Sequence, residues 1–225
     1  MVRRSARLIG TLLCLVGLVA IAWAATTWLW QDPVTALYTQ WEQRRLEREL
    51  EGRLDDFAAP KKATTEVRVS ARPQPSLASV ATRLRRESET GAPLGKIRIP
   101  RLGINMVIVN GTDHESLKAG PGRDRRTFMP GEGELVYIAG HRTTYGAPFA
   151  RIDEMRPGDA IELQMPYAKV KYRVTRHVIV PATDVARLRS PGYEILALQA
   201  CHPRFSARER YIVYARPVSF TSTTR

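Results

Sequence analysis

Cysteine is scarce in this sequence, whose 225 residues include only Cys14 and Cys201. Two cysteines cannot form a scaffold of several disulfides, and there is no CxxC or CxxxC pair to hold zinc. No internal repeat is present. Hydrophobic residues make up 44% and charged residues 25%, a globular composition that excludes wholesale disorder and collagen-like repetition. One compact domain of ~100–150 residues fits this length, with room for accessory segments.

Negative charge is also in short supply. The 22 Asp and Glu residues are outnumbered by 35 Lys and Arg residues, which gives a formal net charge of +13. A chain this basic is expected beside a polyanion, and nucleic acid, an anionic membrane and an anionic wall polymer all fit the charge. A nucleic-acid role needs a cytoplasmic domain or a face of aromatic and basic residues, and neither is evident.

Charge is missing altogether from residues 8–30. As a helix rising 1.5 Å per residue, this segment spans about 34 Å, enough for a hydrocarbon core of ~30 Å. Arg3, Arg4 and Arg7 precede it. The positive-inside rule therefore predicts a single-pass membrane protein with residues 1–7 in the cytoplasm and the rest of the chain outside.

A cleaved signal peptide is the alternative for this segment. Ala20-Ile21-Ala22 and Ala22-Trp23-Ala24 could each serve as a cleavage site. The apolar run is longer than the ~7–15 residues typical of a signal peptide, which favours the retained anchor. Cys14 then lies inside the span, and Cys201 is the only thiol outside the cell.

Two accessory segments follow the anchor. Residues 31–57 carry apolar residues at helical spacing beside a mixed-charge face, which predicts a solvated stalk helix. A dimerising coiled coil is the alternative, but one slip in phase argues against a sustained heptad. Prolines and small polar residues fill residues 58–94, which predicts an extended linker with a short helical turn near 77–84.

The folded domain is expected over residues 95–218, with a short tail at 219–225. Short apolar or alternating runs, separated by glycine and proline, are typical of strands. These runs lie at residues 96–99, 104–109, 135–139, 160–165, 170–180, 195–200 and 211–215. About eight short strands with few helical segments predict a mainly β domain, either an antiparallel barrel or a sandwich.

The thiol outside the cell lies where a strand ends. Cys201 follows the apolar run 195–200, so its side chain is expected at a cleft. A cysteine nucleophile needs a cation or a base nearby. His141 is the best-placed histidine, because it follows the strand at 135–139 and opens a polar turn. His202 is adjacent to Cys201, but successive side chains of a strand point to opposite faces.

Acyl transfer also needs a donor to the developing oxyanion. Arg208 and Arg210 both precede the strand at 211–215. An antiparallel return of that strand past 195–200 would bring its first residues to the end that carries Cys201. Arg210 is closer to the strand and is the better candidate, and an ordinary surface position is the alternative for either arginine.

Two segments resemble the sortases, the membrane-anchored cysteine transpeptidases of Gram-positive bacteria. Residues 137–149, YIAGHRTTYGAPF, are similar to the family's histidine motif. Residues 198–215, LQACHPRFSARERYIVYA, are similar to its cysteine motif and arginine strand, and residues 94–104 to its first strands. The Cys-His-Pro and Gly-His-Arg-Thr-Thr sequences are most similar to actinobacterial class E sortases.

The resemblance implies a mainly β, sortase-like eight-stranded barrel with short helices, preceded by the transmembrane helix. It places the catalytic triad on His141, Cys201 and Arg210. The residues that it suggests for substrate binding are Leu198, Ala200 and Tyr145. The family usually has threonine at the positions of Ala197 and Ala200, so altered efficiency or substrate fit is expected.

The resemblance also implies a mechanism and partners. The substrate would be a secreted protein with a sorting signal of the LPxTG type, or LAxTG in class E. The thiolate of Cys201 would attack the Thr–Gly carbonyl, His141 would protonate the departing amine, and Arg210 would hold the oxyanion. A lipid-linked peptidoglycan precursor would supply the acceptor amine at the membrane. Neither a metal nor an organic cofactor is implied, nor is a nucleic acid.

Two other functions remain compatible with the sequence. A cysteine hydrolase would use the same three residues and release the acyl group to water. A non-catalytic, membrane-tethered β-barrel would bind wall polymer through its basic surface, and Cys201 would then be inert.

Overall fold

The computed structural model describes residues 2–29, 33–58 and 76–222. The helices span Val2–Leu29 (α1), Pro33–Ala58 (α2), Leu77–Glu87 (α3) and His114–Ala119 (α4). The strands span Pro93–Ile99 (β1), Ile104–Asn110 (β2), Gly122–Arg123 (β3), Leu135–Ala139 (β4), Ala160–Gln164 (β5), Ala168–Pro181 (β6), Ile195–His202 (β7) and Glu209–Ser222 (β8). The 3-10 turns span Pro100–Leu102 (η1), Ile152–Glu154 (η2) and Val185–Leu188 (η3).

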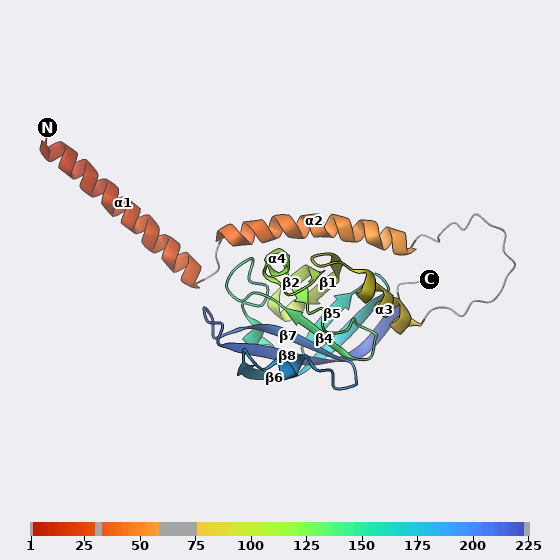
Figure 1. Cartoon of the computed structure of the whole chain (residues 1–225). Coiled ribbons are helices and arrows are strands. Elements are labelled where there is room, and N and C mark those ends of the chain that lie inside the picture. The colour runs from red at the N-terminus through yellow and green to blue at the C-terminus, as the bar shows by residue number, and fades with distance from the viewer. Residues whose placement is uncertain (1, 30–32, 59–75, 223–225) are drawn as a thin grey trace.

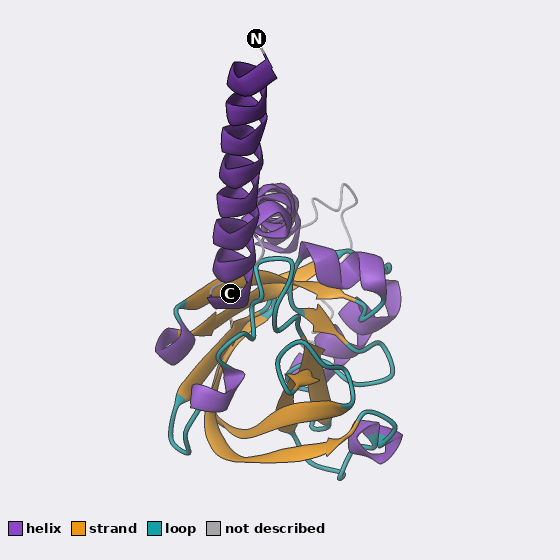
Figure 2. Cartoon of the chain, turned by 90° about the vertical axis from the view of Figure 1, so that its left-hand side faces the viewer, coloured by secondary structure: helices purple, strands orange, loops and turns teal. Residues whose placement is uncertain are grey.

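The eight strands form a closed barrel in the order β1-β2-β3-β4-β7-β8-β6-β5. Antiparallel pairing of β5 with β1 completes the closure. The predicted eight-stranded barrel is therefore confirmed, with short helices around it (Figures 1 and 2). Two neighbouring pairs, β2–β3 and β4–β7, are parallel, so the barrel is mixed rather than wholly antiparallel.

The main core fills the barrel interior, because alternate residues of each strand point inward. In β6, Ala168, Val170, Tyr172 and Val174 are buried, while the residues between them are exposed. In β7, the inward residues are Leu196, Leu198 and Ala200.

A second apolar cluster covers the outer face of β4, β7 and β8. Its buried members are Leu135, Tyr137, Val180, Ile195, Ala197, Ile212 and Tyr214. Leu188 of η3, from the long loop between β6 and β7, packs against this cluster. The outer face of these three strands is thus apolar at one end, and the residues that follow the cluster along β7 lie on the same face.

Helix α1 is long and apolar enough to cross a membrane. The stretch Ser5–Ala25 has a mean hydropathy of 2.4, and none of it is buried. The apolar helix thus begins slightly earlier than the predicted span at 8–30, and residues 30–32 lie outside the described residues.

Helix α2 lies along the barrel, which differs from the expected solvated stalk. Leu46 and Leu50 are buried against Val107 and Val109 of β2 and Ala119 of α4. The phase slip in the apolar pattern hid this contact: among the described side chains of α2, Leu46 and Leu50 are the apolar ones that pack against the barrel. Val34, Leu37, Tyr38 and Trp41 of that stripe are exposed instead.

Polar contacts fix the position of α2 as well. The side-chain amide of Gln43 donates to the carbonyls of Val107 and Ala119, and its oxygen accepts from the N–H of Val107. The hydroxyl of Thr39 donates to the carbonyl of Lys118 at 2.8 Å. These contacts satisfy backbone groups at the edge of β2 and the end of α4.

Helix α3 occupies part of the segment expected as a linker. The side chain of Ser76 accepts from the N–H of Ser79 and caps the helix. Ala81 and Leu84 are buried in the main core, and Arg85 forms a 2.9 Å ion pair with Glu132. Residues 77–87 therefore belong to the folded body, and residues 59–75 of the expected linker lie outside the described residues.

Candidate active site

Cys201 lies near the end of β7 on the outer face of the barrel. The alternation along the strand turns Leu198 and Ala200 into the core, where both are fully buried. Gln199 and Cys201 point to the outer face and are partly exposed. The thiol is therefore accessible at the position predicted for it.

This alternation corrects the expectation that Leu198 and Ala200 bind substrate. Their side chains pack among the aliphatic residues of the barrel interior and line no outer pocket. Gln199 lines the pocket beside Cys201 instead. Ala197, the other replacement for a family threonine, is fully buried in the outer apolar cluster.

Arg210 is the cross-strand neighbour of Cys201. The antiparallel register of β7 and β8 pairs these two residues directly, which places their Cβ atoms on the same face, roughly 5 Å apart. The Nη1 atom of Arg210 donates to the carbonyls of Ala207 at 2.8 Å and Glu209 at 3.0 Å. These bonds hold the guanidinium at the turn that precedes β8. Arg208 does not line the pocket.

His141 reaches Cys201 through the parallel pairing of β4 with β7. Ala139 is in register with Gln199, and the N–H of Gly140 donates to the carbonyl of Gln199 at 3.0 Å. His141 follows Ala139 by two residues, and Cys201 follows Gln199 by two residues. Parallel strands run to the same edge of the sheet, so the two side chains meet at one rim.

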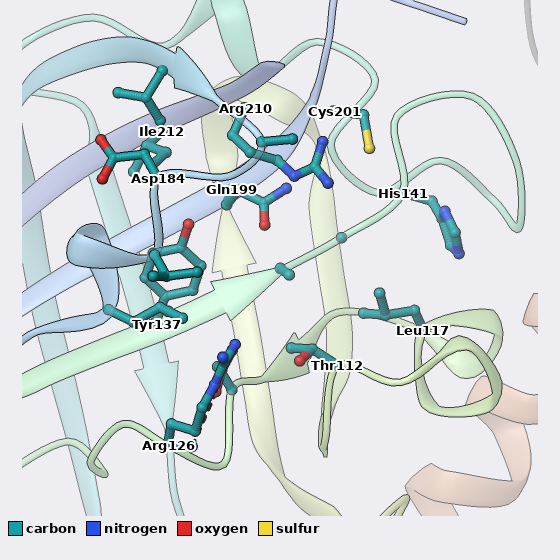
Figure 3. Close-up of a pocket in the computed structure, with 17 residues that line it drawn as sticks. Thr112, Leu117, Arg126, Tyr137, His141, Asp184, Gln199, Cys201, Arg210 and Ile212 are labelled. Carbon is teal, nitrogen blue, oxygen red and sulfur yellow. Dashed lines mark hydrogen bonds and ion pairs between the residues drawn. The ribbon is translucent and has the colours of Figure 1, made fainter. Parts of the chain in front are cut away.

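One cavity of about 290 Å³ is lined by all three predicted catalytic residues. In the view of Figure 3, the sulfur of Cys201 lies between the guanidinium of Arg210 and the imidazole of His141. No hydrogen bond joins the thiol to the imidazole among the described residues. The remaining lining residues are Thr112, Leu117, Asp124, Arg126, Tyr137, Ala139, Gly140, Val180, Ala182, Asp184, Val185, Leu188, Gln199 and Ile212.

The surroundings of His141 favour the neutral form of its imidazole. Burial lowers its pKa from the usual value, and the nearby side chain of His114 lowers it further. Its Nε2 atom is buried and has no hydrogen-bond partner among the described residues. A buried nitrogen without a partner is costly, so it marks a position where a substrate group can bind.

Tyr145 lies beside His141 but does not line the cavity. The two ring centroids are 5.1 Å apart, and the ring of His114 lies 6.1 Å from that of Tyr145 on another side. Tyr145 has a positive φ of 52°, an uncommon conformation for a residue other than glycine. Its expected role in substrate binding stays a prediction, and in this geometry its ring contacts the imidazole of His141 rather than the cavity.

Arg142 joins the loop that carries His141 to the end of β7, a contact that the sequence did not reveal. Its Nη1 atom donates to the carbonyl of Cys201 at 3.3 Å and to Nδ1 of His202 at 2.8 Å. Its Nη2 atom forms a 2.9 Å ion pair with Asp153, and the side chain is almost fully buried. Position 142 immediately follows His141, so this guanidinium fastens the histidine loop to the end of β7.

The other titratable residues make no metal site. No group of three His, Cys, Asp or Glu side chains with the arrangement of metal ligands occurs among the residues described. His177 stacks on Tyr211 with ring centroids 5.1 Å apart, and His202 contacts the same ring. The chemistry that the cavity offers is therefore that of a thiol, an imidazole and a guanidinium.

Comparisons with known proteins agree with this geometry. A sortase-domain profile matches residues 97–218, more than half of the chain. Sortase D of Bacillus subtilis is 32% identical over 136 residues, which cover 58% of this chain and 67% of that protein. Sortase SrtE1 of Streptomyces coelicolor is 25% identical over 152 residues, 58% of this chain but only 42% of the relative.

A solved structure has the same fold. The Clostridium perfringens sortase D5 transpeptidase superposes with a TM-score of 0.62 at 22% sequence identity, over 79% of this chain and 99% of that one. The profile match over residues 97–218 covers the strands and loops that carry Cys201, His141 and Arg210. The chain is a member of the sortase family of cysteine transpeptidases.

Proposed function

We propose that this chain is a membrane-anchored sortase that cleaves a sorting signal of the LPxTG or LAxTG type between Thr and Gly and transfers the acyl group to a cell-wall precursor amine. The observation that carries the proposal is the cavity shared by Cys201, His141 and Arg210. The acceptor amine, the lipid-linked precursor and the class E assignment belong to this proposal. Relatives named as class D and class E sortases both match the chain.

The proposed reaction has two acyl-transfer steps. The thiolate of Cys201 attacks the carbonyl carbon of the Thr–Gly bond, and Arg210 stabilises the oxyanion. As the C–N bond breaks, His141 in its imidazolium form gives its proton to the departing glycine amine. The acceptor amine then attacks the thioester, loses a proton to His141 and releases the thiolate.

The depressed pKa of His141 affects this chemistry. A histidine with a lowered pKa is mostly neutral near pH 7, so the imidazolium form needed as the acid is a minority. Neutral imidazole favours the second step, in which His141 accepts a proton. Binding of a substrate amine near the unpartnered Nε2 atom would stabilise the proton where it is needed.

The proposed localisation rests on α1. Its apolar stretch of 21 residues can span the hydrocarbon core. With the N-terminal arginines in the cytoplasm, the barrel lies outside, where secreted substrates and lipid-linked precursors meet the enzyme. Anchoring raises the effective concentration of the enzyme relative to both partners.

The test is a cleavage assay with the full chain in detergent micelles, because α2 and α3 are packed into the folded body. Peptides that contain Leu-Pro-x-Thr-Gly or Leu-Ala-x-Thr-Gly are incubated with and without an acceptor amine. An amine-linked product supports transpeptidation, whereas a free acid that no amine suppresses supports the hydrolase alternative. No cleavage of either peptide by the wild-type chain would contradict the proposal.

Matched variants assign the chemistry to residues. Cys201→Ala and Arg210→Gln should lower cleavage by about 10³-fold or more. Cys14→Ala and Arg208→Gln remove the same chemical groups away from the cavity and should retain activity. If Cys201→Ala were as active as the wild type, the non-catalytic barrel that binds wall polymer would become the better hypothesis.

A further inference from the structure

The face of α2 that points away from the barrel is unusually apolar for an exposed surface. Val34, Leu37 and Trp41 are 61%, 67% and 59% exposed. Arg44 and Arg48 continue the same line of residues and are also exposed. The spacing of three, four, three and four residues places all five on one side of the helix. We call these five residues the outer face of α2.

The opposite side of α2 has a different role. Thr39, Leu46 and Leu50 are buried against the barrel. The inner apolar face therefore packs on the barrel, whereas Val34, Leu37 and Trp41 of the outer face are exposed among the residues that the structure describes. The cost of exposing three large apolar side chains at neighbouring positions indicates that something covers them.

We propose that the outer face of α2 lies on the lipid surface of the membrane, and this inference rests on the membrane anchoring proposed for α1. An interfacial helix carries tryptophan and aliphatic residues that enter the headgroup region and basic residues that pair with anionic lipid. The outer face has this composition, with apolar residues in its first two turns and arginines in the next two.

Proximity to α1 identifies lipid as the occupant. Helix α1 ends at Leu29 and α2 begins at Pro33. Five residues of extended chain reach at most about 18 Å, so Val34 lies within that distance of Leu29. A membrane that contains α1 therefore brings its headgroup region within reach of the first turn of α2.

The arrangement of the helices is consistent with this contact. Helix α2 lies along one side of the barrel (Figure 1). Helix α1 rises from that same side (Figure 2). Glu49 and Glu51 are exposed as well, and their negative charges would be repelled by anionic lipid. The favourable electrostatic contribution therefore comes from Arg44 and Arg48, which lie nearer the start of the helix.

The contact would also orient the active site. Through its inner face, α2 touches α4 and the loop that carries His141. A helix held flat on the lipid would therefore fix the height and tilt of the cavity above the membrane. A lipid-linked acceptor would then approach a cavity of fixed orientation.

The experiment measures how deeply single residues of the full chain lie in lipid. A nitroxide label is placed at L37C, at L12C in α1 or at F220C on the barrel, each in a chain with Cys14→Ser and Cys201→Ala. Phe220 is an exposed apolar residue of β8, 43% exposed, and is the matched control. The proteins are reconstituted in vesicles of phosphatidylglycerol and phosphatidylcholine. Collision with oxygen, which concentrates in lipid, and with a water-soluble nickel chelate is then measured.

We expect the oxygen-to-nickel ratio at position 37 to exceed that at position 220 by about threefold or more. If the label at position 37 were as accessible to nickel as the label at position 220, while position 12 lay in lipid, the proposed lipid contact of α2 would be wrong. The membrane span proposed for α1 would then still hold. Shielding of position 37 from both reagents would indicate contact with a second copy of the chain and would also contradict the lipid contact of α2. Accessibility of position 12 to nickel would contradict both the lipid contact of α2 and the membrane span of α1.

Discussion

Thr35 of α2 and Tyr145 of the histidine loop are joined by a hydrogen bond, in which the backbone N–H of Tyr145 donates to Oγ1 of Thr35 at 2.9 Å. Thr35 lies outside the 97–218 segment that matches the sortase domain. The ring of Tyr145 in turn contacts His141. The accessory helix α2 thus contacts the imidazole of His141 indirectly, through Tyr145, whose positive φ needs support from outside the loop.

The first prediction follows from this contact. Thr35→Val keeps the shape of the side chain but removes the acceptor, which costs a net stabilisation of about 1 kcal/mol in the loop. We expect kcat for peptide cleavage to fall about fivefold, with little change in KM, because His141 is held in position less often. Thr35→Ser retains the hydroxyl and should restore kcat.

The control for Thr35 lies in α3. Thr82→Val removes a hydroxyl that donates to Glu132 at 2.7 Å, also between an accessory helix and the barrel but away from His141. It should lower the melting temperature without lowering kcat at 25 °C. Equal losses of kcat in the two variants, in proportion to stability, would show that Thr35 acts only on the overall fold.

A second prediction concerns Arg142. Arg142→Lys keeps the positive charge, but an ammonium group cannot reproduce the planar fork that contacts Cys201, His202 and Asp153. The free energy of unfolding should fall by about 1–3 kcal/mol as buried acceptors lose their donor. The rate of cleavage should fall about tenfold or more, since the histidine loop is no longer fastened to β7.

Arg151 provides the matched control on the same loop. It forms an ion pair with Glu154 in which both side chains are about half exposed, and such pairs contribute about 0–1 kcal/mol. Its Nη2 atom also donates to the carbonyl of Leu102 at 3.1 Å, an acceptor that a lysine ammonium group can use as well. Arg151→Lys should therefore leave both unfolding by urea and cleavage nearly unchanged. If Arg142→Lys behaved like Arg151→Lys, the role assigned to Arg142 would be wrong.

A third prediction concerns the titration of His141. Its pKa is lowered by burial and by His114, so the folded protein binds fewer protons than the unfolded chain just below pH 6.5. This contribution makes the protein less stable as the pH falls through that window. His114→Gln removes the side chain whose charge lowers the pKa of His141, so the pKa of His141 should rise toward its usual value.

Proton NMR of the histidine Cε1–H signals measures this shift directly. The limb of the pH–rate profile that reports His141 should move to higher pH in the same variant. His177→Gln is the control, because His177 stacks on Tyr211 and is not among the groups that shift the pKa of His141. An unchanged His141 titration in His114→Gln would contradict the electrostatic coupling between the two histidines.

Much of the barrel could be predicted because its strands carry a clear sequence pattern. Apolar runs at 135–139 and 195–200 correspond to β4 and β7, and the residues that follow them meet at one edge. Parallel pairing of these strands brings His141 toward Cys201. No local pattern indicates that the pairing is parallel, because the two strands are far apart in the chain.

Other features could not be read from local patterns. Charged residues lie between the buried residues of α2, so the sequence pattern does not show which apolar residues pack against the barrel. That packing follows from the fold of the barrel surface, which no local pattern encodes. Leu198 and Ala200 were expected at the substrate, yet the two-residue period that exposes Cys201 turns both inward. Arg142 was indistinguishable from the many surface arginines until its three partners were known.

The last prediction contrasts two glycines. Gly140 links β4 to His141, and a Cβ atom there would lie 2.7 Å and 2.9 Å from ring carbons of Phe149 and 3.1 Å from Pro148. Phe149 is fully buried and has no space to move. Gly140→Ala should therefore reduce the free energy of unfolding by about 1–3 kcal/mol and displace the loop that holds His141, with a loss of cleavage.

Gly52 in α2 is the opposite case, because a Cβ atom there meets nothing within 4 Å. Gly52→Ala removes the entropic penalty of glycine inside a helix and should raise the free energy of unfolding by about 0.5–1 kcal/mol. Urea unfolding and peptide cleavage, measured on both variants, check the pair. Cleavage should be unchanged in Gly52→Ala, since α2 keeps its contacts with the barrel. A Gly140→Ala protein with wild-type stability and activity would show that the histidine loop can shift without displacing the imidazole.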